Sequence, residues 1–160
     1  MTSASKRVVN PLHSLSRLFL TSTVTAAATT SALLVLSTRE TGHAAAALNA
    51  TSHILWGDDA AKHDRWSLRY TAVGALLNAG AMVSWSFVQG LLPEPRSPLS
   101  AARNAGLVTA LAYLTDYHVV PHRLDPGFDQ RLSRKSLFGA YAVMAGALAV
   151  GALLARKHST

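Results

Sequence analysis

Four long runs of apolar residues, separated by polar segments, dominate the hydrophobic pattern of the chain. A helix needs about 20 mostly apolar residues to cross a bilayer, and each run reaches or nearly reaches that length. The predicted spans cover residues 18–36, 70–92, 101–120 and 137–155. The first and last contain no Asp, Glu, Lys or Arg, which is rare in a long buried helix of a soluble protein. The pattern predicts an all-α polytopic membrane protein, a four-helix transmembrane bundle.

This bundle is expected to form a single domain over residues 18–155, with an N-terminal tail at 1–17 and a C-terminal tail at 156–160. The first connection contains a mildly apolar segment, residues 43–56. It is too short and too polar to cross the membrane. We therefore expect an interfacial helix there, or a helix that folds back on the bundle.

A secretory signal peptide is the alternative interpretation of the first run, because basic residues precede it and a run of alanines follows. Its apolar stretch of 19 residues is longer than the usual signal core. Arg39 and Glu40 also lie where a neutral cleavage region is expected. The sequence favours a retained span.

The composition agrees with a membrane protein. The 160 residues are 49% hydrophobic and 14% charged, whereas soluble domains carry about 25% charged residues. The net charge of +7 comes from basic residues at the borders of the apolar runs, where they meet anionic lipid headgroups. This distribution indicates the lipid bilayer as the partner and no nucleic acid. The absence of cysteine excludes disulfides, thiolate nucleophiles and cysteine-ligated metal centres.

Four spans place both chain ends on one side of the membrane and the two longer connections on the other. Lys and Arg number seven on the side of the termini and eight on the opposite side, so the positive-inside rule does not decide the orientation. Because the first helix usually dominates orientation, we expect cytoplasmic termini.

Histidines and carboxylates gather in the two long connections, which share one membrane face. The candidate metal ligands are His53, Asp58, His63, His118 and His122. Imidazole and carboxylate suit Zn, Mn or non-haem Fe. His118 and His122 are four residues apart, but Pro121 between them is expected to end or kink the helix. The sequence favours no cofactor, with a divalent metal as the alternative.

Two polar residues fall inside the predicted spans, Asp116 and Asn78. An intramembrane carboxylate is costly and needs a named partner. We expect a structural ion pair from Asp116 to Arg69 or Arg123. For Asn78 we expect a hydrogen bond to a neighbouring helix.

Small residues recur at helical spacing in the second and fourth runs. They include Gly74, Gly146, Ala147 and Gly151. Such residues let helix backbones approach closely in a membrane. Packing within one bundle is favoured over a homodimer face.

The segments HILWGDDAAKHDR and DYHVVPHRLDPGFDQRLS resemble patterns in small, uncharacterised multi-span proteins of bacterial inner membranes. The resemblance implies that location and transfers no activity. The sequence therefore predicts a non-enzymatic accessory or interaction protein, whose partner would be another membrane protein or a second copy of the chain. A metal- or proton-handling site at one membrane face is the alternative. A small oligomeric transporter subunit is the second alternative.

Overall fold

The computed structural model describes residues 11–157, and side chains from residue 14 onward. Within this range the chain is helical and contains no strand, so the all-α prediction is confirmed for the described residues. Most of the predicted N-terminal tail lies outside them, and its part from residue 11 belongs to the first helix.

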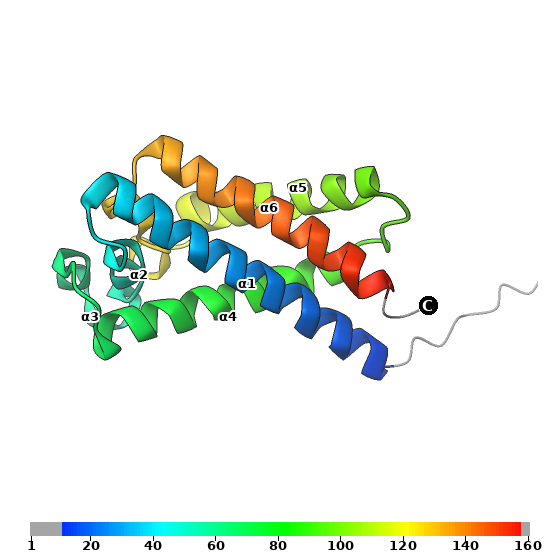
Figure 1. Cartoon of the computed structure of the whole chain (residues 1–160), viewed down its shortest axis with the longest axis horizontal. Coiled ribbons are helices and arrows are strands. Elements are labelled where there is room, and N and C mark those ends of the chain that lie inside the picture. The colour runs from blue at the N-terminus through cyan, green and yellow to red at the C-terminus, as the bar shows by residue number, and fades with distance from the viewer. Residues whose placement is uncertain (1–10, 158–160) are drawn as a thin grey trace, which may run out of the picture.

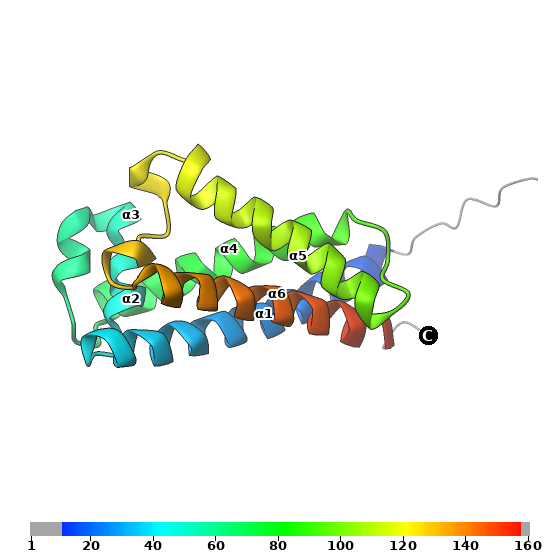
Figure 2. The same ribbon diagram turned by 90° about the horizontal axis from the view of Figure 1, so that it is seen from above.

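Four long helices form the body of the molecule (Figure 1). They are α1 Pro11–Thr41, α4 Val73–Gly90, α5 Pro98–Leu114 and α6 Arg134–Lys157. Helix α1 packs against α6 and α4, while α5 packs mainly against α6. The described chain ends lie at the same end of the bundle as the turn between α4 and α5 (Figures 1 and 2). We call this the terminal end and the opposite one the loop end.

Short helical segments close the loop end. They are α2 Ala46–Thr51, α3 His53–Trp56, η1 Asp58–Lys62, η4 His122–Leu124 and η5 Phe128–Gln130. Two π-helical turns also lie there, η2 Leu68–Ala72 leading into α4 and η3 Thr115–Val119 continuing α5. Each π turn places one residue more than an α-helical turn between hydrogen-bonded partners.

Three helices are long and apolar enough to cross a membrane: Ser14–Thr41, Leu68–Gly90 and Arg134–Lys157. They contain the predicted spans 18–36 and 137–155 and most of 70–92. The predicted span 101–120 falls on α5 and η3 and is not one of the three. Helix α5 has 17 residues and carries Arg103, and the π turn that continues it carries Asp116. By length and apolar composition, the described residues therefore contain three candidate membrane spans.

The first connection contains a helix that is buried inside the bundle. All six residues of α2 are buried, and α2 contacts α1, α4, η1, η2 and η5. The fold-back alternative is the one observed for residues 46–51. The physical reason is that its alanines are small enough to fit between the helix ends, while its polar Asn49 finds partners there. Asn49 Nδ2 donates to the carbonyl oxygens of His63 at 2.7 Å and Arg65 at 3.0 Å, and Asn49 Oδ1 accepts from Thr71.

Close backbone contacts explain two of the small residues. A methyl group on Gly74 would lie 1.8 Å from the carbonyl oxygen of Leu48, so α2 rests directly on the backbone of α4. A methyl group on Gly151 would lie 3.0 Å from Cα of Thr21, where α6 meets α1. Ala147 is buried on the same helix. Gly146 is exposed with open space around it, so its predicted packing role is not seen within the chain.

We expect Gly74→Ala to lower the free energy of unfolding by about 3 kcal/mol, because the methyl group meets a backbone atom that cannot rotate away. Gly80→Ala on the same helix is the matched control, since a methyl group there meets nothing within 4 Å. Denaturant unfolding in detergent micelles, followed by circular dichroism, measures both. Equal stability of the two variants would contradict the close contact between α2 and α4.

Candidate metal centre

Three possible metal ligands from separate parts of the chain meet at the loop end. His53 begins α3, Asp58 begins η1 and His122 begins η4. One ligand atom from each lies within 4.8 Å of the other two. Asp58 Oδ1 is 3.5 Å from His53 Nδ1 and 3.8 Å from His122 Nε2. Two ligands about 2.1 Å from a tetrahedral zinc ion lie about 3.4 Å apart, so two of the three separations need little adjustment.

Two glycines in the left-handed region of φ allow this arrangement. Gly57, with φ of 82°, reverses the chain between α3 and η1 and brings Asp58 back toward His53. Gly127, with φ of 66°, lies against the His53 ring, where a methyl group would come within 3.0 Å of Cδ2. Helix η3 ends at Val119, and Val120 is extended before Pro121. The helix thus ends where Pro121 predicts, which frees His122 to turn toward the other two ligands.

The buried carboxylate of Asp125 contacts both imidazoles at the ring nitrogens that point away from Asp58. Its Oδ2 lies 2.7 Å from His122 Nδ1, and its Oδ1 lies 3.2 Å from His53 Nε2. The backbone oxygen of Asp125 is 2.9 Å from the same His53 nitrogen, and Oδ1 also accepts from the Gly127 backbone N–H. The side chain of Asp125 is 8% exposed. A carboxylate behind a metal-binding histidine fixes its tautomer and orientation.

These contacts leave the opposite ring nitrogens as acceptors. If His53 Nε2 and His122 Nδ1 carry their protons toward Asp125, the lone pairs of His53 Nδ1 and His122 Nε2 face Asp58. His53 is fully buried, and its Nδ1 has no hydrogen-bond partner among the described residues. A buried polar atom without a partner costs about 1–3 kcal/mol, and a metal ion would satisfy it. Asp58 and His122 are exposed, so an ion could enter from solvent.

Charge at the site is set by two carboxylates and one arginine. The hydrogen bond to Asp125 and the charge of that carboxylate raise the pKa of the exposed His122 imidazole above its ordinary value. A raised pKa means that the imidazole keeps its second proton to a higher pH. A metal ion that binds His122 would have to displace that proton. Arg123 donates to the backbone oxygen of His53 and, at 3.3 Å, to that of Leu55. Arg123 therefore ties η4 to α3.

The structure places the other two predicted ligands away from this cluster. The His63 ring stacks on Tyr70 with centroids 4.0 Å apart. His118 is exposed on η3, with its ring 5.7 Å from that of Tyr113. Both lie at the loop end, but neither shares the position between His53, Asp58 and His122.

The expected ion pair of Asp116 is not formed with either arginine. Asp116 Oδ2 accepts a hydrogen bond of 2.6 Å from the Tyr141 hydroxyl of α6. Arg69 instead lies over the rings of Trp56 and Tyr70, and Arg123 is engaged with α3. Asn78 does form interhelical hydrogen bonds, from its Nδ2 to Thr29 at 3.3 Å and Thr30 at 3.1 Å of α1.

Sequence reasoning missed Asp125, the residue that organises the cluster. A local signal exists, since Asp125 follows His122 by three residues and precedes a Pro-Gly pair. The distance in sequence between His53 and Asp125 hides the other half of its role. Comparison with protein-family models, curated proteins and solved structures finds no match for this chain.

Substitution of Asp125 tests the arrangement behind the ligands. We expect Asp125→Asn to weaken zinc binding about 10- to 100-fold, because the amide no longer fixes both imidazoles as proton donors toward residue 125. Asp129→Asn is the matched control, as it removes the same charge from an exposed position in the same loop. Competition with a chromogenic zinc chelator measures both affinities. Equal weakening by the two variants would show that only the net charge matters.

Proposed function

We propose that this chain is an integral membrane protein that binds a divalent first-row transition metal at the loop end of its helix bundle. The buried His53 imidazole carries the proposal, because its Nδ1 has no hydrogen-bond partner, faces Asp58 at 3.5 Å and lies next to His122. Asp125 behind both rings is the arrangement that metal-binding histidines use. The two imidazoles and one carboxylate suit Zn, Mn or Fe.

Three protein ligands leave at least one coordination position for water or another molecule. A structural metal site normally fills all four positions of a tetrahedral ion with protein ligands. The exposed side of Asp58 and His122 gives that position access to solvent. The proposed site therefore exchanges its ion or presents it to a second molecule.

We further propose that α5 and η3 complete a four-helix transmembrane bundle in a bacterial inner membrane. Together they give an almost continuous helix from Pro98 to Val119, about 33 Å at 1.5 Å per residue. This length matches the hydrocarbon core. The outward side chains of the helices include large apolar residues such as Leu76, Phe87, Leu107 and Phe138, which suits contact with lipid. With cytoplasmic termini, the metal site faces the periplasm.

Metal loading tests the site. After removal of metal with a chelator and titration with Zn²⁺, we expect the wild-type protein to bind close to one ion per chain. His122→Ala should bind at least tenfold more weakly, since it removes one of three ligands. His118→Ala is the matched control and should bind as the wild type does, because His118 lies outside the cluster. Equilibrium dialysis with elemental analysis measures all three.

Circular dichroism shows whether each variant keeps its helicity. Folded His122→Ala protein that binds zinc like the wild type would overturn the proposed site. Absence of binding to folded wild-type protein for Zn²⁺, Mn²⁺ and Fe²⁺ would overturn it as well.

Fusions to the C-terminus test the orientation. Green fluorescent protein fused after Thr160 should fluoresce, because it folds in the cytoplasm. Alkaline phosphatase at the same position should be inactive, because it needs the periplasm. An active phosphatase and a dark fluorescent protein would place the termini in the periplasm. The metal site would then lie at the cytoplasmic face.

A further inference from the structure

A cavity of about 120 Å³ lies between the long helices, next to the loop end and on the side of it that faces the terminal end. This is roughly ten times the space that one buried water needs, whereas protein interiors contain few voids larger than a water molecule. Its walls come from α1, α4, η3 and α6, with Ile54, Leu124 and Pro126 closing the loop side. None of the proposed metal ligands lines it, so it is a separate site.

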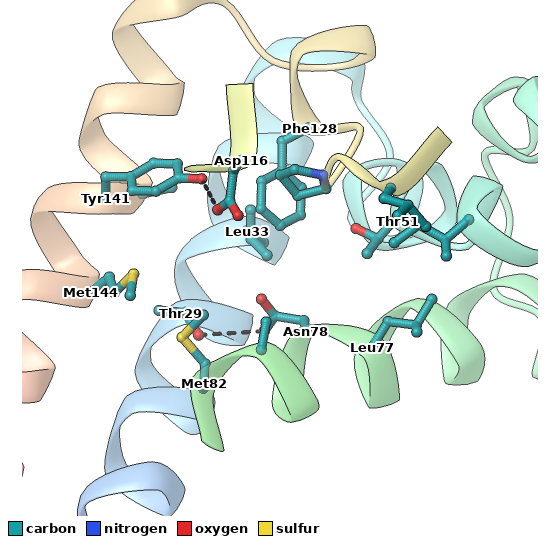
Figure 3. A pocket seen from close by; sticks show the side chains of 15 residues that line it. Thr29, Leu33, Thr51, Leu77, Asn78, Met82, Asp116, Phe128, Tyr141 and Met144 are labelled. Carbon is teal, nitrogen blue, oxygen red and sulfur yellow. Dashed lines mark hydrogen bonds between the residues drawn. The ribbon is translucent and has the colours of Figure 1, made fainter. Parts of the chain in front are cut away.

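The cavity has a polar part and an apolar part. Asp116 of η3 and Asn78 of α4 lie on opposite walls, and the amide oxygen of Asn78 points into the space between them (Figure 3). One turn further toward the terminal end, Met82 and Met144 line the cavity. Methionine side chains are flexible and adapt to the shape of an apolar ligand. The polar end thus lies nearer the loop end and the apolar end nearer the middle of the bundle.

Two acceptor atoms that face the cavity, Oδ1 of Asp116 and the amide oxygen of Asn78, receive no hydrogen bond from a described residue. Among the described residues, the Tyr141 hydroxyl is the donor to Asp116, and it bonds Oδ2. The Asn78 amide group donates to Thr29 and Thr30, and no described residue donates to its oxygen. No basic side chain forms an ion pair with Asp116 in the described part of the chain. A ligand that fits must therefore donate hydrogen bonds, and a cation would also neutralise the carboxylate.

Six of the residues that line the cavity are not fully buried: Leu77 and Ala81 of α4, Asp116 of η3, and Ile54, Leu124 and Pro126 at the loop end. Helices α4 and α5 are close at the turn that joins them and diverge toward the loop end (Figures 1 and 2). Leu77 and Asp116 are half-buried there, whereas Asn78, Met82 and Met144 are buried. A molecule can therefore reach the cavity past the six partly exposed residues, two of which, Leu77 and Ala81, lie on α4 where lipid would surround it.

We infer that this cavity binds a single-chain amphiphile with a primary-amine head group. The ammonium group lies between Asp116 and Asn78 and donates to both, and the first part of the chain extends toward Met82 and Met144. This inference does not rest on the metal site, since the two share no residue.

Photolabelling tests the inference in nanodiscs of phosphatidylcholine, which has no primary amine. The probes are three twelve-carbon chains with a diazirine in the chain and an amine, a hydroxyl or a carboxylate head. We expect the amine to label Leu77, Met82 and Met144 at least fivefold more than the carboxylate does. Leu76 is the internal control, because it is adjacent to Leu77 but faces outward with 72% exposure.

Asp116→Asn keeps an acceptor for Tyr141 but removes the charge. In this variant, amine labelling of the cavity should fall to the level of the alcohol, while labelling of Leu76 is unchanged. His122→Ala should not affect the pattern, which separates the cavity from the metal site. Equal cavity labelling by the amine and either other probe in the wild type would overturn the inference. Undiminished amine labelling in folded Asp116→Asn protein would overturn it too.

Discussion

The carboxylate of Asp125 joins the two long connections of the chain. It contacts His53, which lies 72 positions earlier in the sequence, and at the same time His122 and the backbone of Gly127. A buried carboxylate is stable when several donors compensate its lost hydration. The loop end of the bundle depends on these contacts, since they hold α3, η4 and the approach to η5 in one arrangement. Without Asp125, both imidazoles would lose the groups that orient them.

The same end of the molecule contains most of the polar contacts that resist local opening. Asn49 ties α2 to the segment before α4, and Arg131 binds Asp64 and the backbone oxygen of Ala61. In the long helices, by contrast, Thr25 and Thr29 bond to carbonyl oxygens of their own helix. The long helices associate through close packing, as at Gly151, and through a few hydrogen bonds such as those from Asn78 to α1, while a denser set of hydrogen bonds fixes the loop end. This division suits a chain whose helix surfaces face lipid and whose loops face water.

The long helices could be predicted from the sequence because the length and apolar composition of a run are local properties. Residues 18–36 and 137–155 contain no charged residue, and they lie within helices long enough to cross a membrane. The fate of residues 46–51 could not be predicted, since burial of a short alanine-rich helix depends on Gly74 and Asn49 finding partners far along the chain. Composition does not distinguish such a helix from one at the membrane surface.

The candidate site shows the same limit. Four predicted spans place the two long connections on one side, which predicts a common site for His53, Asp58, His63, His118 and His122, and the structure brings only three of these together. The separation of His63 and His118 from that site depends on ring stacking with Tyr70 and on the position of η3. Asp116 was expected to find an arginine, but the facing turn of α6 presents Tyr141. Partners set by helix rotation are decided by packing, which one sequence does not reveal.

The π turn at Thr115–Val119 has a consequence for how the chain can change over evolutionary time. A π turn is equivalent to one extra residue in an α-helix, and each residue rotates a helix by about 100°. Removing one residue here would restore a regular helix but rotate everything that follows relative to α5. Asp116 and His122 would then no longer face the cavity and His53 together. The number of residues between α5 and Pro121 is therefore fixed by both sites at once, even where the identity of the side chains is free to vary.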